Sequence, residues 1–184
     1  MEKLSVREMN ESDIPYLVKY WTQESEEHYL GMGVDMLKLA SAEDLEANFR
    51  KQISLDPIEA KAYATIWELN GNPIGHCNIN TIKLGDAAHM HLHIWDAANR
   101  EKGYGSKLLK LSLPLFFEIF GLQVLKCEPY ALNQGPNAMC EKAGFEFIKT
   151  YMTSPSFMSF EQETNQWIMT RARFEELYWS GEKN

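Results

Sequence analysis

The sequence predicts a mixed α/β fold in which one central sheet is covered by helices. Short apolar runs rich in β-forming residues alternate with segments whose apolar residues recur at helical spacing. In the second half of the chain the order is strand, helix, strand, helix, strand, which is typical of a layered α/β domain. No repeat or low-complexity linker divides the 184 residues, so we expect a single domain over residues 1–184.

Two helices are expected near the N-terminus, each preceded by a serine. A serine hydroxyl can accept a hydrogen bond from a free amide of the first helical turn. Ser12 is therefore predicted to cap a helix over Asp13–Tyr20, and Ser41 a second helix over about Ala42–Gln52. Residues 23–42 are expected to be irregular.

Four strands are expected in the first hundred residues. Leu4–Met9 alternates apolar and polar side chains, which indicates a half-buried strand. Ala62–Leu69 and Ile74–Thr81 flank the segment Asn70-Gly71-Asn72-Pro73, and because Asn-Gly tolerates positive φ, this pattern predicts a hairpin. A further strand is expected over Ala88–Trp95.

The remaining elements follow from the same patterns. Leucines and phenylalanines at helical spacing predict a helix over Gly103–Phe120, with Pro114 a candidate kink. Gly144 is expected to end a later helix. The elements expected after residue 120 are a strand at Gln123–Cys127, a helix at about Pro136–Ala143, and strands at Phe145–Met152 and Trp167–Ala172.

Composition and charge exclude several classes of protein. A net charge of −8 argues against general nucleic-acid binding, and no run of ~20 apolar residues indicates a membrane span. The first ten residues lack a secretory signal, and Cys77, Cys127 and Cys140 form no CxxC pair, so a reducing, cytoplasmic location is expected. Residues 1–60 hold 13 of the 26 acidic side chains against 6 of the 18 basic ones, which indicates either a site for a cation or a solvated face.

The window from Trp95 to Ser106 is the most informative part of the sequence. There a strand ends and a helix starts at Gly103 and Gly105, so free backbone amides and the positive end of a helix dipole meet at one place. Such a place suits a pyrophosphate. The alternative is that the glycines only allow close packing of helix on sheet. Neither a Walker loop nor a GxGxxG fingerprint is present.

Two motifs resemble a known family. The segment Arg100-Glu101-Lys102-Gly103-Tyr104-Gly105 resembles the R/Q-x-x-G-x-G/A loop of the GNAT superfamily of acetyl-CoA-dependent N-acetyltransferases. The segment 133–145, NQGPNAMCEKAGF, is similar to that family's N-x-x-[SAP]-x-x-x-x-E-K-x-G-F segment, and its ending is most similar to the ribosomal-protein alanine acetyltransferase branch. The resemblance covers about residues 4–172.

The resemblance implies a fold, a co-substrate and a set of contacts. The fold is a mixed, mostly antiparallel sheet of six or seven strands with about four helices and splayed central strands. Acetyl-CoA would lie in the splay, with backbone groups of His93, Ile94 and Trp95 and the side chain of Asn133 on its pantetheine arm. The residues placed at the pyrophosphate are Arg100, Glu101, Lys102, Gly103, Tyr104, Gly105 and Ser106.

Alternating histidines offer a base for deprotonating an amine. His89, His91 and His93 fall on one face of a regular strand. By their distance from Arg100, His89 and His91 match the paired histidines of arylalkylamine N-acetyltransferases, and their ordinary pKa suits a base acting directly or through water. Two alternatives stay open: a metal site, which we do not expect because no local carboxylate or thiolate completes it, and buried histidines with a purely structural role.

The acid that protonates the departing thiolate is less clearly marked. Many members of the family carry a tyrosine four residues before the helix-ending glycine, and that position holds Cys140 in this chain. Cys140 is one candidate acid, although it is equally suited to a small place in the core. Tyr130 is the other candidate.

The sequence therefore predicts an N-acetyltransferase domain that moves an acetyl group from acetyl-CoA to a primary amine of a small cationic molecule. One alternative is acetylation of a protein N-terminus or lysine, and another is a catalytically silent acyl-CoA sensor; a metal-binding protein is a more distant one. Neither nucleic acid nor membrane is expected as a partner. The chain would be a monomer or a homodimer, with the aromatic loop at 153–164, carrying Phe157 and Phe160, as a candidate contact surface.

Overall fold

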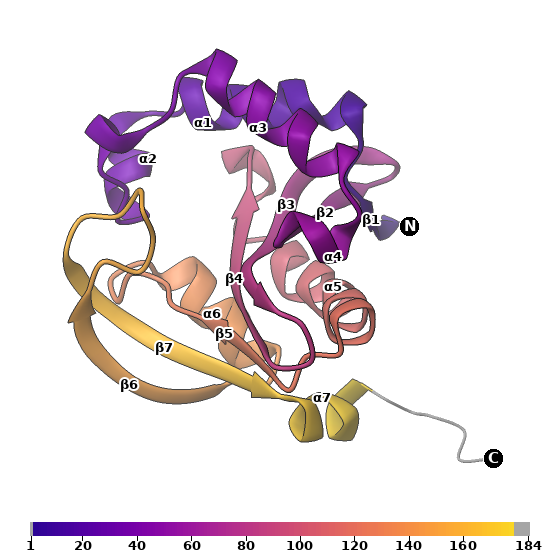
Figure 1. Cartoon of the computed structure of the whole chain (residues 1–184). Helices are drawn as coiled ribbons and strands as arrows, with labels where there is room; N and C mark the ends of the chain where they lie inside the picture. Colours follow the sequence, from indigo (N-terminus) through magenta and orange to yellow (C-terminus); the bar gives the residue numbers. More distant parts are fainter. Residues whose placement is uncertain (1, 179–184) are drawn as a thin grey trace.

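A computed structural model of the protein describes residues 2–178, so Met1 and residues 179–184 of the predicted domain lie outside the described residues. Seven strands form one sheet in the order β1-β2-β3-β4-β5-β7-β6, in which only β4 and β5 pair in parallel (Figure 1). This confirms the predicted mixed, mostly antiparallel sheet. The strands are β1 Leu4–Glu8, β2 Ala62–Leu69, β3 Asn72–Lys83, β4 Ala87–Ile94, β5 Val124–Cys127, β6 Glu146–Thr153 and β7 Gln162–Thr170.

Helices cover both faces of this sheet. The α-helices are α1 Ile14–Gln23, α2 Glu26–Gly31, α3 Ala42–Ser54, α4 Pro57–Ala60, α5 Tyr104–Phe120, α6 Gln134–Lys142 and α7 Arg171–Tyr178. Short 3-10 turns occupy Glu11–Asp13, Met36–Lys38 and Ala97–Asn99. The predicted helix starting at Gly103 is α5, which runs continuously through Pro114. None of the helices in residues 2–178 has the length and apolar character needed to cross a membrane.

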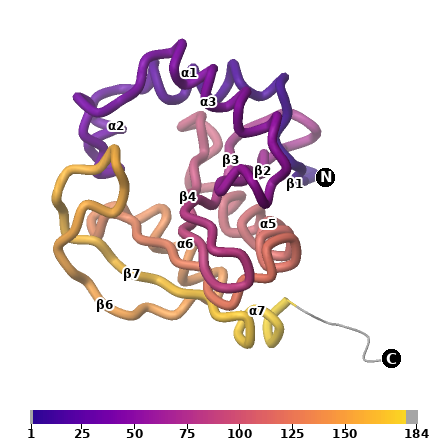
Figure 2. Tube along the Cα trace, in the orientation of Figure 1, coloured from indigo at the N-terminus to yellow at the C-terminus, as the bar shows by residue number. Residues whose placement is uncertain are grey.

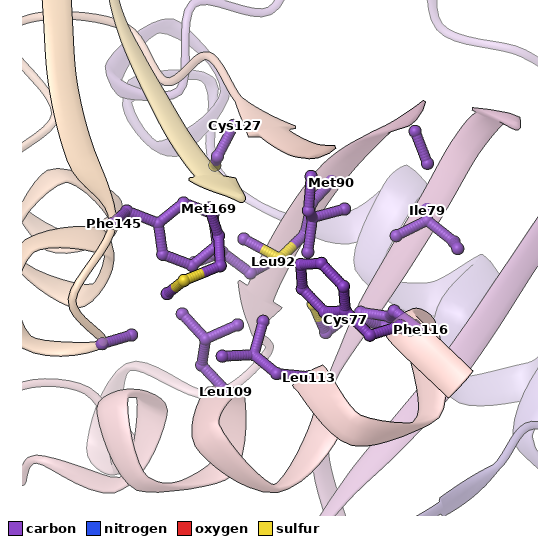
Figure 3. Close-up of a cluster of buried hydrophobic side chains, with 14 of the residues drawn as sticks. Cys77, Ile79, Met90, Leu92, Leu109, Leu113, Phe116, Cys127, Phe145 and Met169 are labelled. Atoms are coloured by element: carbon purple, nitrogen blue, oxygen red, sulfur yellow. The ribbon is translucent and has the colours of Figure 1, made fainter. Parts of the chain in front are cut away.

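The two faces of the sheet carry two separate apolar cores. On one face, side chains such as Cys77 and Met90 pack against Leu113 and Phe116 of α5 (Figure 3). On the other face, Ile66 and Trp95 pack against Leu17 and Trp21 of α1. Alternation along each strand sends neighbouring side chains to opposite cores, which is why β2 is buried on both sides.

The region around the first helices differs from the prediction. Ser12 does not cap α1; its backbone amide instead donates to the side chain of Asn10, which caps a preceding 3-10 turn. Residues 23–42 are not irregular, because Ser25 caps the short helix α2, and a 3-10 turn follows. The predicted cap at Ser41 is confirmed, since its Oγ accepts from the Asp44 amide at 3.1 Å.

The C-terminal hairpin is longer than predicted. Strand β7 begins at Gln162 instead of residue 167, because its residues from Gln162 to Ile168 pair with β6. Helix α7 was not predicted at all. Its first residue, Arg171, donates to the carbonyls of Phe117 and Leu122, and so fastens α7 to the end of α5. The loop between β6 and β7 reaches back to the segment after α2, where Val34 bridges Ser159 (Figure 2).

The central strands part at a defined point. The pairing of β4 with β5 ends at Met90 and Cys127. Beyond it, β4 stays paired with β3 as far as Ile94, while the chain after β5 pairs with β7 through a bridge from Tyr130 to Thr164. The predicted splay of the central strands is therefore present.

Candidate active site

A cavity of about 300 Å³ opens beside this splay, on the face of the sheet that carries α1 and α3. Its walls come from α1, α3, β3, β4, the chain after β5 and the β6–β7 loop. The residues that line it are Leu17, Trp21, Met32, Val34, Leu45, Phe49, Gln52, Ala64, His76, Asn78, Asn80, Met90, His91, Leu92, His93, Cys127, Glu128, Pro129, Tyr130, Asn133, Pro136, Pro155, Ser156, Met158, Ser159 and Gln162.

The histidines of β4 share one face, as the alternating pattern predicts. Their neighbours Ala88, Met90 and Leu92 are buried in the opposite core, against α5. His91 and His93 line the cavity, whereas His89 lies outside its lining and is one-third exposed. The structure thus separates the two candidate bases. His91 lines the cavity, whereas His89 contacts the cavity through Glu128.

The cavity histidines are held neutral. Burial, together with a smaller contribution from His89, lowers the pKa of His91 to about 4, although the charge of Glu128 acts in the opposite direction. Burial likewise lowers the pKa of His76 to about 3 and that of His93 well below its usual range. The Nε2 of His91 lies 3.2 Å from Nδ2 of Asn80. This amide nitrogen can only donate, so Nε2 is the acceptor. His91 therefore presents a neutral imidazole to the cavity.

His93 hydrogen-bonds with Tyr20 and stacks on His76. The Tyr20 hydroxyl lies 3.1 Å from Nδ1 of His93 and 3.0 Å from Nε2 of His28. The His93 ring stacks on His76, whose Nδ1 accepts from the indole of Trp95 at 2.7 Å. The sequence analysis missed His76, which lines the cavity, and His28, which contacts Tyr20 and Arg100, because each stands alone in the sequence and only the fold brings them near His93.

Glu128 is a third residue that the sequence analysis missed. It follows the last residue of β5, and its side chain is 9% exposed. Its Oε1 accepts from the Tyr151 hydroxyl at 2.5 Å and from Gln166 Nε2 at 2.7 Å, while Oε2 lies 3.5 Å from Nδ1 of His89. Hydrogen bonding by His89, Tyr151 and Gln166 outweighs burial and lowers the Glu128 pKa to about 2. The carboxylate is therefore ionised at the cavity wall.

The loop before α5 has the backbone needed to receive phosphate groups. Glu101 and Gly103 both adopt positive φ, of 60° and 76°, and no side chain caps the helix. A Cβ on Gly103 would meet nothing within 4 Å, so its surroundings are open to a ligand. Gly105 differs, because a Cβ there would lie 2.2 Å from the Met139 sulfur, and it thus serves the close packing of α5 on α6. The close-packing role therefore fits Gly105, while the phosphate-binding role of Gly103 stays a prediction.

Several side chains in the predicted cofactor site are engaged elsewhere. The Arg100 guanidinium donates to the carbonyls of Ile94 and Trp95 and contacts His28, so only its backbone is left to face a phosphate. Trp95 also donates its amide to Ile74, so its amide is not free, and its contact with pantetheine stays a prediction. Within residues 2–178 the side chains of Lys102 and Ser106 form no hydrogen bond with these groups, whereas the Tyr104 hydroxyl donates to Glu2.

Asn133, Tyr130 and Cys140 take different places. Asn133 begins α6 without a capping hydrogen bond from its side chain and lines the cavity, as its predicted role requires. Tyr130 lines the cavity too, with its ring against Phe160. Cys140 is fully buried in the opposite core, and a hydrogen bond with Cys127 together with burial raises its pKa. A thiol in that environment is a poor proton donor and is not brought to the cavity.

The acidic side chains of the first third of the chain do not line the cavity. The residues that this part of the chain contributes are apolar or amide side chains of α1, α3 and the segment after α2. Glu24 lies 3.8 Å from Arg100, and none of the acids in residues 2–60 is in the lining. The charge of the cavity comes instead from Glu128. Within residues 2–178, no group of three or more His, Cys, Asp or Glu side chains is arranged to hold a metal ion.

Residues 3–146 match the model of the acetyltransferase (GNAT) domain family. The chain belongs to the GNAT acetyltransferase family. As a GNAT protein it is an acetyltransferase that uses acetyl-CoA, and the open phosphate loop and the splay described above fit that co-substrate. No curated protein sequence matches the chain.

Solved GNAT structures share the fold. RimL, a ribosomal L7/L12 alpha-N-protein acetyltransferase in complex with coenzyme A, is 17% identical with a TM-score of 0.74, covering 92% of this chain and 95% of that one. Spermidine N-acetyltransferase from Vibrio cholerae, in complex with CoA and spermine, is 16% identical with a TM-score of 0.75, at 93% and 97% coverage. Aminoglycoside acetyltransferase AAC(6')-Ib, in complex with coenzyme A and kanamycin, is 20% identical with a TM-score of 0.72, at 95% and 99% coverage.

Proposed function

We propose that this protein transfers the acetyl group of acetyl-CoA to the primary amine of a small cationic molecule, and that the whole of residues 1–184 serves this one activity. One observation carries the proposal: a single cavity joins the point where β4 and β5 part to both a neutral imidazole, His91, and an ionised carboxylate, Glu128. A thioester in the splay would be next to a proton acceptor and next to a group that attracts a cation.

The phosphate end of acetyl-CoA would be held by backbone amides. The free amides from Gly103 to Ser106 and the positive end of the α5 dipole attract anions. The pantetheine arm would run along the edge of β4 beyond Met90, where His93 and Ile94 have no β5 partner, and Asn133 would approach it from α6. The co-substrate supplies an activated acyl group with a thiolate as leaving group.

His91 would take the proton released by the attacking amine at Nε2, which would give up its hydrogen bond from Asn80 to accept it. An imidazole must be neutral to do so, and burial keeps His91 neutral at pH 7. The nitrogen becomes a much stronger acid as it bonds to the acyl carbon, so a base of low pKa suffices at that stage. The Glu128 carboxylate would stabilise the resulting imidazolium, and His89 would act through Glu128 and through water. Tyr130, on the cavity wall, would donate a proton to the departing thiolate.

Amine-dependent thiol release tests this proposal. Purified protein with acetyl-CoA is offered small primary amines, and free coenzyme A is followed with a thiol reagent; peptides with N-terminal alanine or serine, and a lysine peptide, form a second set. The proposal predicts release that depends on a small amine. Release with peptides alone would favour a protein acetyltransferase, and acetyl-CoA binding without release would favour a sensor.

A further inference from the structure

We propose that Glu128 is the anchor for the acceptor's ammonium group, and that the acceptors are primary amines carrying a single positive charge on an apolar body. This inference rests on the proposed function and names its substrate class. It assigns a recognition role to a residue that no motif marks.

The position of Glu128 directs its carboxylate toward the reacting end of the cavity. The preceding residue, Cys127, is the last residue of β5 paired with β4, and its side chain lies in the core against α5. Glu128 is in the lining of the cavity on the opposite face, together with His91. An ammonium bound there would therefore lie beside both the splay and the candidate base. It would lose one proton to solvent to become the neutral nucleophile, and the nitrogen would give its second proton to His91 as it bonds to the acyl carbon.

The carboxylate is built into the site and still has capacity for a ligand. Its Oε1 accepts from Tyr151 and Gln166, and among residues 2–178 its Oε2 faces only His89. A carboxylate oxygen offers two lone pairs, so Oε2 keeps one for a further donor. Tyr151 and Gln166 lie on β6 and β7, so both strands of that hairpin fix the orientation of the group.

The rest of the cavity selects against additional charge. Glu128 is the only residue with a formal charge in the lining contributed by residues 2–178, because His76, His91 and His93 are neutral there. Leu17, Trp21, Leu45, Phe49 and Met158 make much of the wall apolar. A second ammonium group on the acceptor would lose its water without gaining a carboxylate, which is costly. An aliphatic or aromatic body would gain from the same burial.

The test compares an amine with its isosteric alcohol. Binding of 2-phenylethylamine and 2-phenylethanol is measured by calorimetry at pH 7 for the wild type and for Glu128→Gln. We expect the wild type to prefer the amine at least tenfold, and the variant to lose that preference to within about twofold. Glu163→Gln, which neutralises an exposed carboxylate outside the lining, is the matched control and should keep the preference. A wild type without preference, or a variant that retains it, would overturn the proposal.

A second comparison needs no variant and so does not depend on how Glu128→Gln folds. The wild type is offered 2-phenylethylamine and spermidine at equal concentrations, and binding is measured by competition. The phenylethylamine should bind at least tenfold more tightly, and a preference for spermidine would contradict the substrate class. Both comparisons measure binding, so they do not depend on turnover. If the amine preference is present but no thiol is released, the proposed function is wrong and the role of Glu128 in amine binding stands.

Discussion

Met90 of β4 and Cys127 of β5 are the last residues through which these parallel strands pair, and both line the cavity that opens beyond them. The end of the β4–β5 pairing and the wall of the cavity therefore coincide at Met90 and Cys127. This arrangement places Glu128, one residue after Cys127, beside the splay of β4 and β5.

Replacing Gly103 with valine should weaken acetyl-CoA binding by more than tenfold. Gly103 has a φ of 76° and open space where a side chain would be, so a branched side chain would block the approach of phosphate to the amides. Gly85→Val is the matched control, because Gly85 also has positive φ and open space but lies in the turn before β4. Each valine costs about 1–2 kcal/mol of strain. Calorimetric affinities that fall equally in both variants would refute the phosphate loop.

Replacing His91 with alanine should lower turnover by roughly 100-fold or more at pH 7, the usual effect of losing a general base. The loss should shrink at pH 9, where hydroxide can take the proton of the attacking nitrogen in place of His91, and acetyl-CoA affinity should not change. His89→Ala should have a smaller effect, because His89 is outside the cavity lining. An equal loss at both pH values would indicate that His91 is structural.

Replacing Arg100 with lysine should destabilise the fold more than it weakens acetyl-CoA binding. The guanidinium donates to the carbonyls of Ile94 and Trp95, and lysine cannot reproduce that fork. A loss of about 2 kcal/mol corresponds to a fall in Tm of roughly 4–8 °C. Lys102→Ala, at an exposed position of the same loop, should leave Tm unchanged. An unchanged Tm with lost acetyl-CoA affinity would instead place Arg100 on a phosphate.

Stability should fall as the pH drops from about 6.5 toward 4. The unfolded histidines bind protons below a pKa of about 6.5, whereas folded His76 and His91 stay neutral down to about 3 and 4. The unfolded state thus gains protons that the folded state does not, at up to about 1.4 kcal/mol per pH unit for each group. Urea unfolding across this range should show a shallower slope for His91→Gln, and an unchanged slope would contradict the neutral, buried His91.

Local signals in the sequence were sufficient to predict part of the fold and some residues of the candidate site. The glycines before α5 and the Asn133 segment are contiguous motifs, and the histidines of β4 share a face because a strand has a period of two. Glu128 has no such signal. Its role depends on His89, Tyr151 and Gln166, which lie 39, 23 and 38 residues away in the sequence and meet only through the register of β4, β5, β6 and β7. Helix α7 was missed because its apolar spacing is weak and its hold on α5 comes from Arg171.

Thermal unfolding with and without acetyl-CoA tests the central claim most directly, with ATP and NAD as controls. Saturation at about 100 times the dissociation constant stabilises a folded protein by roughly 2.7 kcal/mol, which raises Tm by several degrees in a chain of this size. We predict that rise with acetyl-CoA in the wild type, and its loss in Gly103→Val. No rise with acetyl-CoA, or an equal rise with ATP and NAD, would contradict an acetyl-CoA site at the splay of β4 and β5.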